Sequence, residues 1–146
     1  MMNSKKPAAH LIGHGPAQKE TMRWRSDTEV AFIRNVTHSP ITTVVTKRKG
    51  LYYVYFQVGF TGAGTNVRLL IEVITLHEST NVNSTLLTGS ESITSPPPYL
   101  DNWSASLSQG GLANLKVGQK LYVHVSHPHL VDYSEGKTFF GLVMVS

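Results

Sequence analysis

The sequence predicts an all-β fold, an antiparallel sandwich of the jelly-roll type. Short runs of apolar or alternating residues recur along the chain, and clusters of Gly, Pro, Ser, Asn and Asp separate them, as in antiparallel strands joined by turns. No segment has the apolar spacing of an amphipathic helix. The 146 residues suffice for one domain with its own core, and about ten strands in this length suit a jelly roll.

Five of the predicted strands lie in the first half of the chain. They are apolar or β-branched runs bounded by turn-forming residues: Ala8–Ile12, Met22–Arg25, Val30–Ile33, Thr42–Thr46 and Leu51–Thr61. The glycine-rich segment from Gly59 to Gly64 is interpreted as a bulged or flexible turn. Residues 1–6 are expected to form a disordered leader, so that the domain spans residues 7–146.

The second half of the chain supplies the other five strands. They are Arg68–His77, Thr85–Glu91, Leu107–Leu115, Lys120–Ser126 and Lys137–Val145. The segment from Ser90 to Asn102 contains Pro96-Pro97-Pro98, and proline cannot donate a hydrogen bond within a sheet. This segment is therefore predicted to be a long surface connection.

The strand that begins at Leu51 has two apolar faces. Successive side chains of a strand point to opposite sides, so Tyr52, Val54, Phe56, Val58 and Phe60 share one side and fit a sandwich core. Leu51, Tyr53, Tyr55 and Gln57 share the other side. An exposed apolar stripe of this kind marks an interface, whereas a central strand would have both faces covered by its own domain. The residues alone leave both interpretations open.

Composition narrows the function classes. The net charge of +4 comes largely from Lys5, Lys6 and the Lys47-Arg48-Lys49 triplet, two short clusters rather than a continuous basic face, so no nucleic-acid partner is expected. The chain has no cysteine, which excludes disulfides and thiolate chemistry. No run of about twenty apolar residues is present, so a membrane anchor would lie outside this chain.

Three N-glycosylation sequons favour an extracellular protein. They are Asn35-Val36-Thr37, Asn83-Ser84-Thr85 and Asn102-Trp103-Ser104, each near turn-forming residues.

Catalysis has one candidate, the histidines His124, His127 and His129. Imidazoles at such spacing can ligate zinc or copper, as in a jelly-roll metalloprotein of the cupin type. The cupin pattern has a His-x-His pair, a glutamate soon after it and another histidine on a later strand. In this chain Glu135 comes too late and no histidine follows His129. No nucleophile elbow or phosphate-binding glycine loop is present. We therefore expect no enzyme activity, no metal site and no cofactor.

Ordered motifs along the chain resemble the tumour necrosis factor ligand family. They are Lys6-Pro7-Ala8-Ala9-His10-Leu11-Ile12-Gly13, Trp24-Arg25, Gly50-Leu51-Tyr52-Tyr53-Val54-Tyr55, Gly110-Gly111-Leu112, Leu115 to Leu121, Pro128-His129-Leu130-Val131 and Lys137-Thr138-Phe139-Phe140-Gly141. Among members, the opening, the Trp24-Arg25 region and the Pro128 motif look most like lymphotoxin-alpha. The segment from Leu130 to Tyr133 together with the Lys137 motif looks more like the death receptor 3 ligand and Fas ligand.

The resemblance implies a homotrimer that presents a receptor-binding groove between each pair of neighbouring subunits. It implies that the trimer interface contains Tyr53, Tyr55, Ser108, Gly110, Leu112, Phe139, Val143 and Val145. Ser108 stands where the family often has an aromatic residue, so the axial packing is expected to be less aromatic. A C1q-like trimeric jelly roll is an alternative, but its usual collagen-like Gly-X-Y repeat is not found in this sequence. A glycan-binding or capsid sandwich would fit the strands without explaining the motifs.

The same resemblance implies partners and contacts. The partners are the cysteine-rich ectodomains of tumour necrosis factor receptors, bound by a cytokine secreted or shed from a type II membrane precursor to signal in immunity or cell death. The implied receptor contacts are Arg25, Asp27, Glu29, Ser79, Thr80, Asn81, His129, Leu130, Asp132 and Tyr133. Several members place a tyrosine anchor where Thr80 stands, so receptor binding is expected to rest on other loops, and a glycan on Asn83 would lie beside the groove.

Overall fold

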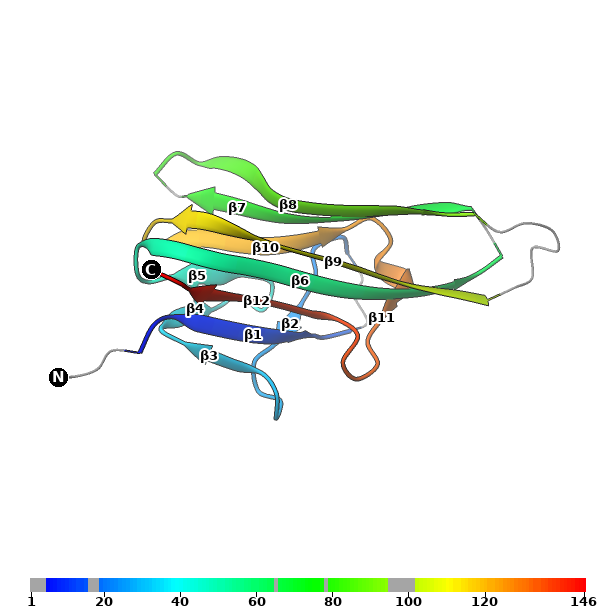
Figure 1. The fold of residues 1–146 in the computed structure, drawn as a ribbon, viewed down its shortest axis with the longest axis horizontal. Helices are drawn as coiled ribbons and strands as arrows, with labels where there is room; N and C mark the ends of the chain where they lie inside the picture. Colours follow the sequence, from blue (N-terminus) through cyan, green and yellow to red (C-terminus); the bar gives the residue numbers. More distant parts are fainter. Residues whose placement is uncertain (1–4, 16–18, 65, 78, 95–101) are drawn as a thin grey trace.

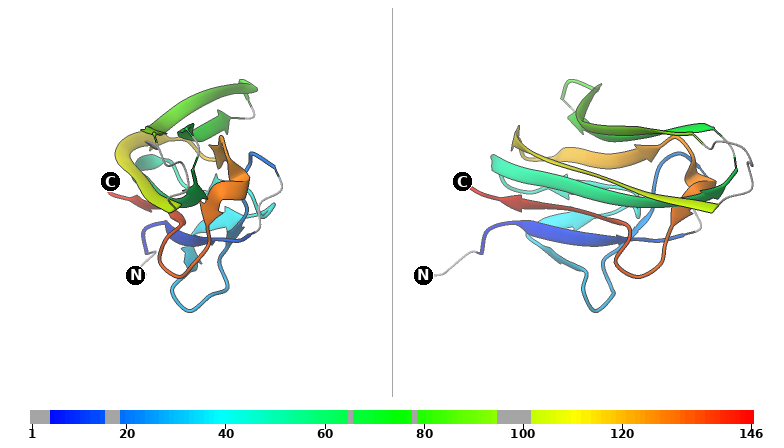
Figure 2. Two further views of the ribbon diagram at one scale, coloured as in Figure 1. Left: turned by 90° about the vertical axis from the view of Figure 1, so that its right-hand side faces the viewer. Right: turned by 45° about the vertical axis from the view of Figure 1, so that its right-hand side comes forward.

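The structure is a computed structural model that describes residues 5–15, 19–64, 66–77, 79–94 and 102–146. The described chain folds into two antiparallel sheets that face each other (Figures 1 and 2). Its one described helical element is a short 3-10 turn, η1 (Pro128–Leu130). No helix in the described ranges is long and apolar enough to cross a membrane. The predicted all-β sandwich is confirmed.

The larger sheet has seven strands. They are β1 (Ala8–Gly13), β2 (Trp24–Arg25), β3 (Phe32–Arg34), β6 (Gly50–Ala63), β9 (Asn102–Leu115), β11 (Val131–Asp132) and β12 (Phe139–Met144). The main path runs β11-β6-β12-β1-β2, with β3 also paired to β1 and β9 also paired to β6. The first and last strands of the chain, β1 and β12, therefore lie side by side at the centre of the sheet (Figure 1).

The smaller sheet has five strands in the order β4-β5-β10-β7-β8. They are β4 (Val36–His38), β5 (Val44–Thr46), β7 (Val67–His77), β8 (Val82–Ile93) and β10 (Gln119–Val125). Strand β8 forms one edge, so its backbone pairs on one side only, with β7.

The core lies between the two sheets and contains the predicted face of β6. Tyr52, Val54, Phe56, Val58 and Phe60 are all at most 1% exposed. Alternate residues of β7 and β10 face them from the smaller sheet and are equally buried. Burial of each large side chain contributes about 1.5 to 3 kcal/mol to the stability of the fold. The alternation of apolar residues is therefore the main reason why this side of each strand faces the core.

Several strand boundaries differ from the prediction. The strand expected from Met22 begins at Trp24, because the chain crosses between sheets there: the Met22 N–H donates to the Val123 carbonyl at 2.9 Å. The strand expected from Val30 begins at Phe32, since the Ala31 N–H donates to the Thr28 side chain and closes a turn. Strands β4 and β11 were not predicted, because segments this short carry no measurable alternation.

The predicted connection from Ser90 to Asn102 is wrong at its ends. Strand β8 continues to Ile93 along β7, and β9 already begins at Asn102, opposite Ala63 of β6. The turn predicted from Gly59 to Gly64 is wrong for the same reason, since β6 stays paired to β9 through Ala63. The glycines serve packing here: a Cβ on Gly62 would collide with the Trp103 ring.

Two expectations concern residues outside the described ranges. Residues 1–4 of the expected leader and the Pro96-Pro97-Pro98 run both lie there. The last two leader residues are described: the carbonyl of Lys5 accepts a hydrogen bond from Asn35 at 2.6 Å, and that of Lys6 accepts one from Arg34 at 2.9 Å.

Candidate functional site

The candidate site begins on the outer face of the seven-stranded sheet, the side turned away from the core. Strand register places Tyr55 of β6 between Gly110 of β9 and Gly141 of β12. Two residues earlier on β6, Tyr53 lies between Leu112 of β9 and Val143 of β12. We define the outer face by the residues that this register brings together: His10, Tyr53, Tyr55, Gln57, Ser108, Gly110, Leu112, Phe139, Gly141 and Val143.

Two glycines make room for the tyrosine rings on this face. A Cβ on Gly110 would collide with the Tyr53 ring, and one on Gly141 would collide with the Tyr55 ring and with the backbone oxygen of Ala9. The rings therefore lie down against the sheet, with their centroids 5.9 Å apart. Ser108 and Gly110 leave a shallow hollow beside them.

His10 on β1 extends this aromatic group. Its Nδ1 lies 2.7 Å from the Tyr55 hydroxyl oxygen, within hydrogen-bond distance, and its ring centroid is 5.1 Å from that of Phe139. Partial burial lowers the pKa of His10 below its usual value, because a desolvated imidazole resists protonation. Sequence reasoning missed His10, although its position between buried Ala9 and Leu11 indicates an outward-facing residue.

Nothing in the described chain covers the outer face. Leu112 is 63% exposed, Val145 just past β12 is 42% exposed and Tyr53 is 40% exposed. Phe32, the register partner of His10 on β3, is also exposed. An apolar, aromatic surface of this kind is typical of a contact between proteins. Of the two interpretations of the β6 strand, its own domain therefore covers one face only: β6 is a central strand, but its outer face is open.

Seven of the residues predicted for a trimer interface belong to the outer face, and Val145 extends it. The prediction of that interface therefore converges on one surface, although the eight residues come from three strands far apart in sequence. Sequence alternation could place each residue on a side of its strand, but only the β9-β6-β12 order brings them together.

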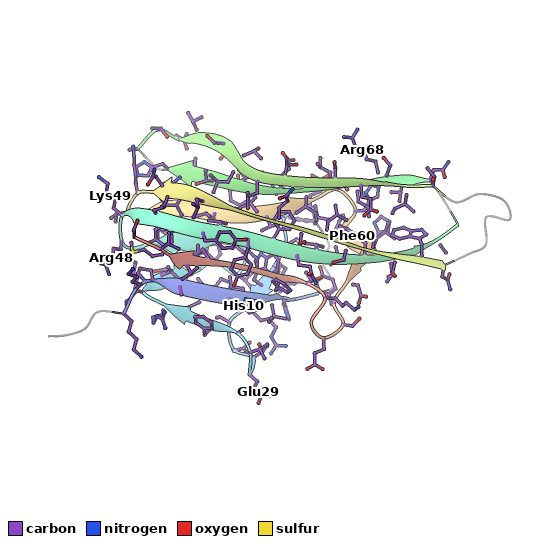
Figure 3. The ribbon with its side chains drawn as sticks, viewed as in Figure 1. His10, Glu29, Arg48, Lys49, Phe60 and Arg68 are labelled. Atoms are coloured by element: carbon purple, nitrogen blue, oxygen red, sulfur yellow. The ribbon has the colours of Figure 1, made fainter. Side chains whose placement is uncertain are left out.

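The loop after β2 carries three of the predicted receptor contacts. The Arg25 Nε atom lies 3.1 Å from Asp27 Oδ1, and this ion pair lowers the pKa of Asp27. Glu29 is exposed at the tip of the loop (Figure 3). The Ala31 N–H donates to Thr28 Oγ1 at 3.2 Å and closes the loop, so that its acidic side chains project into solvent.

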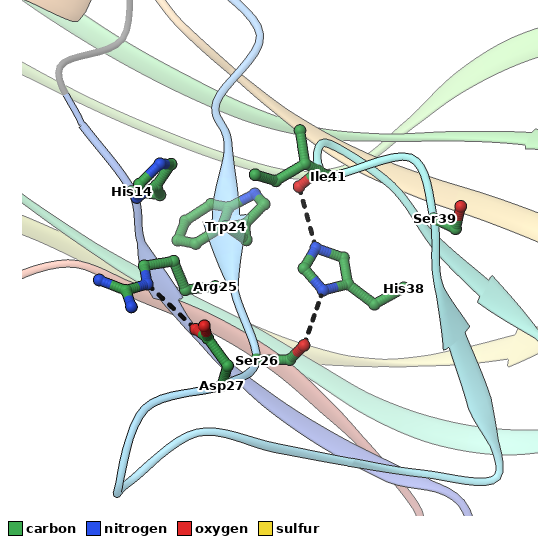
Figure 4. A pocket seen from close by; sticks show the side chains of 8 residues that line it. All are labelled: His14, Trp24, Arg25, Ser26, Asp27, His38, Ser39 and Ile41. Atoms are coloured by element: carbon green, nitrogen blue, oxygen red, sulfur yellow. Dashed lines mark hydrogen bonds and ion pairs between the residues drawn. The ribbon is translucent and has the colours of Figure 1, made fainter.

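An open pocket lies at the base of this loop (Figure 4). His38 spans it, with Nδ1 3.1 Å from Ser26 Oγ and Nε2 2.9 Å from the carbonyl oxygen of Ile41. The pocket is further lined by His14, Trp24, Arg25, Asp27 and Ser39. His38 thus ties the loop that carries Arg25 and Asp27 to the turn that follows β4.

The turn between β7 and β8 carries Ser79, Thr80 and Asn81. The Thr80 hydroxyl donates to the His77 carbonyl at 3.1 Å, and Ser79 Oγ lies 2.5 Å from His77 Nδ1. Asn81 has a φ of 51°, a left-handed conformation that asparagine tolerates better than most residues. Thr80 therefore caps its own turn instead of projecting as an anchor.

The remaining predicted contacts lie in η1 and the residues around β11. His129 is exposed, whereas Leu130 and Tyr133 are partly buried and pack against the core. Asp132 accepts a hydrogen bond from the Ser134 N–H at 2.9 Å, and its hydrogen bonds with Ser134 lower its pKa. Within this group, His129 and Asp132 are the residues available to a partner, while Leu130 and Tyr133 hold the loop in place.

The three segments do not meet on one protomer. The loop at 26–31 and the loop that leads into β12 project from the same side of the sandwich, whereas the turn at 79–81 lies at the opposite edge (Figures 1 and 2). A surface that contained all ten predicted residues would need more than one copy of the chain.

The histidine cluster has no metal-binding geometry in the described part of the chain, where no group of three His, Cys, Asp or Glu residues could hold an ion. The His124 ring lies against the Tyr122 ring, with centroids 5.2 Å apart, and the ring centroids of His127 and His129 are 6.0 Å apart. The three sequon asparagines are exposed, and Asn35 uses its amide to donate to the Lys5 carbonyl.

Comparison with known proteins identifies the family. Residues 22–145 match the model of the TNF (Tumour Necrosis Factor) family, and the chain belongs to that family. It is 36% identical over 162 residues to lymphotoxin-beta of Marmota monax, covering 99% of this chain and 52% of the relative. It is 35% identical over 160 residues to lymphotoxin-beta of Homo sapiens, covering 95% and 64%.

Lymphotoxin-alpha of Marmota monax is also similar, at 30% identity over 143 residues, covering 93% of this chain and 68% of that protein. The predicted membership of the tumour necrosis factor family and the resemblance to lymphotoxin-alpha are thereby confirmed, but the prediction did not name lymphotoxin-beta, to which the chain is more identical in the relatives named here. The chain spans between about half and two thirds of the length of the lymphotoxin-beta relatives named here.

Proposed function

We propose that this chain is the receptor-binding domain of an extracellular cytokine that acts as a homotrimer. It binds and clusters cysteine-rich receptors of the tumour necrosis factor receptor family at the grooves between subunits. The action is geometric and needs no catalysis or cofactor, because three equivalent grooves bring receptors together and raise their effective concentration. The domain reaches the extracellular space by secretion or by release from a membrane-anchored precursor.

The open outer face is the observation that carries the proposal. Tyr53, Leu112 and Val145 are exposed on a chain that belongs to the tumour necrosis factor family. A threefold arrangement buries this face of every copy against its neighbours, with the Tyr55 and Phe139 rings in the contact. The same surface on each copy takes part, so the assembly closes without leaving a free face.

The placement of the loops supports a groove between two subunits. The loop after β2, which carries Arg25, Asp27 and Glu29, lies with the loop that leads into β12 on one edge of the sandwich, while the turn between β7 and β8, which carries Ser79, Thr80 and Asn81, lies on the opposite edge (Figures 1 and 2). When copies stand side by side, one edge of each meets the other edge of its neighbour. The groove between them then gathers all of these residues into one receptor site.

Within the groove, polar and charged groups carry the recognition. Thr80 folds back on the His77 carbonyl, so it offers the groove no projecting side chain, and Leu130 and Tyr133 pack against the core. Exposed charges such as Asp27 and Glu29 mainly set orientation and association rate. A glycan on Asn83, which is exposed on β8, would border the same groove and limit the partners that enter.

Binding of the purified chain to a panel of immobilised tumour necrosis factor receptor ectodomains tests this proposal. We expect saturable binding to at least one receptor and an association rate that falls as salt is raised. The substitution Glu29→Gln should slow association, whereas Glu91→Gln, on β8 away from the groove, should not. A trimer that binds no receptor in the panel, or equal effects of both substitutions, would contradict the proposed groove.

A further inference from the structure

The fold gathers basic residues that are far apart in sequence at one end of the sandwich. The exposed turn from β5 to β6 contributes three of them, Arg48 and Lys49 being labelled in Figure 3. Both chain ends of the described structure reach the same region (Figure 1). We define the basic end by its seven exposed cations: Lys5, Lys6, Arg34, Lys47, Arg48, Lys49 and Lys116.

Hydrogen bonds join the segments that carry these residues. Arg34 Nε donates to the Lys6 carbonyl at 2.9 Å, and Lys6 Nζ donates to the Val145 carbonyl at 3.4 Å. The Val145 N–H in turn donates to the carbonyl of Leu51, two residues after Lys49, at 2.7 Å. The N-terminal segment, β3, the C-terminus and the start of β6 therefore form one connected surface.

The turn at Lys47-Arg48-Lys49 is held from both sides. The hydroxyl of Tyr52, a fully buried residue, donates to the Arg48 carbonyl at 2.6 Å. The Thr46 hydroxyl donates to the Lys116 carbonyl at 2.5 Å and so brings Lys116 beside the turn. The backbone positions of these cations are thus fixed before any partner binds, which reduces the entropy lost on binding.

No acidic side chain neutralises the basic end in the described part of the chain. The Arg25–Asp27 ion pair lies in the loop after β2, outside the basic end. The described acidic residues lie in that loop, near β10, along β7 and β8, or after η1: Glu20, Asp27, Glu29, Glu72, Glu91, Asp132 and Glu135. The basic end thus concentrates about half of the 13 Lys and Arg residues of a chain whose net charge is only +4.

We propose that the basic end binds a sulfated polysaccharide chain of the glycosaminoglycan type. A group of exposed cations attracts a linear polyanion, because binding releases the polyanion's condensed counterions. The cations of the basic end are spread over an open surface, which suits a chain with regularly spaced sulfates better than it suits a small anion that needs a pocket. The choice of a polysaccharide over a phospholipid surface rests on the proposed extracellular function, since anionic lipids concentrate in the cytoplasmic leaflet.

Nucleic acid is a weaker fit to this surface. Single-stranded nucleic acid is bound by cations together with aromatic rings on which bases stack. Among the described aromatic residues, Phe32 and Tyr53 have the most exposed rings, and both belong to the side of the sheet proposed to meet other subunits. In a trimer with its axis along that side, three basic ends would face the same direction and bind one polysaccharide multivalently.

Heparin immobilised on a biosensor tests the proposal, with fully desulfated heparin as the reference surface. The variant K47Q/R48Q/K49Q is compared with K19Q/R23Q/R68Q, which removes the same charge from exposed sites outside the basic end. We expect the first variant to bind heparin at least about tenfold more weakly and to lose about 2 to 3 from the slope of log Kd against log salt. The second variant should behave like the unmodified chain.

Three results would overturn the proposal. One is equal weakening of both variants, which would mean that net charge alone drives binding. Another is equal binding to desulfated heparin. The third is equal or tighter binding to phosphatidylserine vesicles or to a single-stranded oligonucleotide of matched length. If the first variant does not fold, K5Q/K6Q/K116Q, which removes three of the other four cations of the basic end, replaces it in the comparison.

Receptor binding and mass in solution, measured on the same variants, separate this proposal from the proposed function. Loss of heparin binding with unchanged mass and receptor binding supports the basic end as a separate site. A chain that binds heparin but neither trimerises nor binds receptors would contradict the proposed function and leave the basic end standing.

Discussion

Gly141 shows at the scale of one residue how the outer face is built. A methyl group there would meet the Ala9 backbone oxygen, which cannot move without disturbing the pairing of β1 with β12. We expect Gly141→Ala to lower the free energy of unfolding by about 1 to 3 kcal/mol, measured by chemical denaturation. Ser108→Ala, on the same face but exposed, should cost far less, and an equal cost for both would contradict the packing described here.

His10 gives the outer face a dependence on pH. Burial lowers its pKa in the folded state, so the unfolded chain binds a proton more readily. The contribution of His10 to stability is therefore complete above the unfolded pKa of about 6.5 and is lost as the pH falls through the lower, folded value. We expect His10→Gln to reduce the loss of melting temperature between pH 7.5 and pH 5.

The informative quantity is the difference between the pH profiles of the unmodified and His10→Gln proteins. Tyr55 and Phe139 are the side chains that contact His10. If the pH profiles of the unmodified and His10→Gln proteins are parallel, His10 is not the source of the dependence.

At the scale of the element, β12 separates two functions by alternation. Phe140 is fully buried, with its ring centroid 5.4 Å from that of Trp24 in the core, whereas Phe139 contacts His10 on the outer face. We expect Phe140→Ala to cost about 3 to 5 kcal/mol in the free energy of unfolding. Phe139→Ala should leave the folded protomer largely intact but shift the assembly toward smaller species on dilution, as followed by light scattering.

These two neighbours form a matched pair, because both substitutions remove the same atoms. Loss of folding in both variants, or an effect of Phe140→Ala on assembly without an effect on unfolding, would contradict the assignment of the two faces.

Elements with clear alternation were predictable from the sequence. The buried face of β6, from Tyr52 to Phe60, follows directly from its period of two. Strands β4 and β11 were not, because two or three residues cannot display a period. The full lengths of β8 and β9 also escaped prediction, since Ser90 to Ile93 and Asn102 to Ser106 are polar or small apart from Ile93 and Trp103. Pairing with β7 and β6 makes these segments strands.

The candidate site was predictable only in part, because it depends on how strands are ordered. Alternation and family resemblance placed Tyr53, Tyr55 and Phe139 on outward sides. The contact of His10 with Tyr55 needs β1, β12 and β6 to be adjacent, which no local pattern reveals. In the same way, the basic end joins two short clusters that look unrelated in the sequence.

In the described ranges, the molecule has one sandwich core and an outer face that no other part of the described chain covers. The loops proposed to meet a receptor lie on opposite edges, so the proposed groove and the closure of the outer face both depend on other copies of the chain. Tyr55, whose ring lies beside those of Tyr53, His10 and Phe139, is the residue whose substitution reports on assembly.

The absolute mass in solution, measured by light scattering on the unmodified chain, Tyr55→Asp and Tyr122→Asp, tests whether the chain assembles through the outer face. Tyr122 is partly buried on β10 of the other sheet and serves as the control for a charge added outside the outer face. We expect three times the chain mass of 16.1 kDa for the unmodified chain and for Tyr122→Asp, and a smaller folded species for Tyr55→Asp. A monomeric unmodified chain, or a Tyr55→Asp protein that keeps its threefold mass, would contradict this expectation.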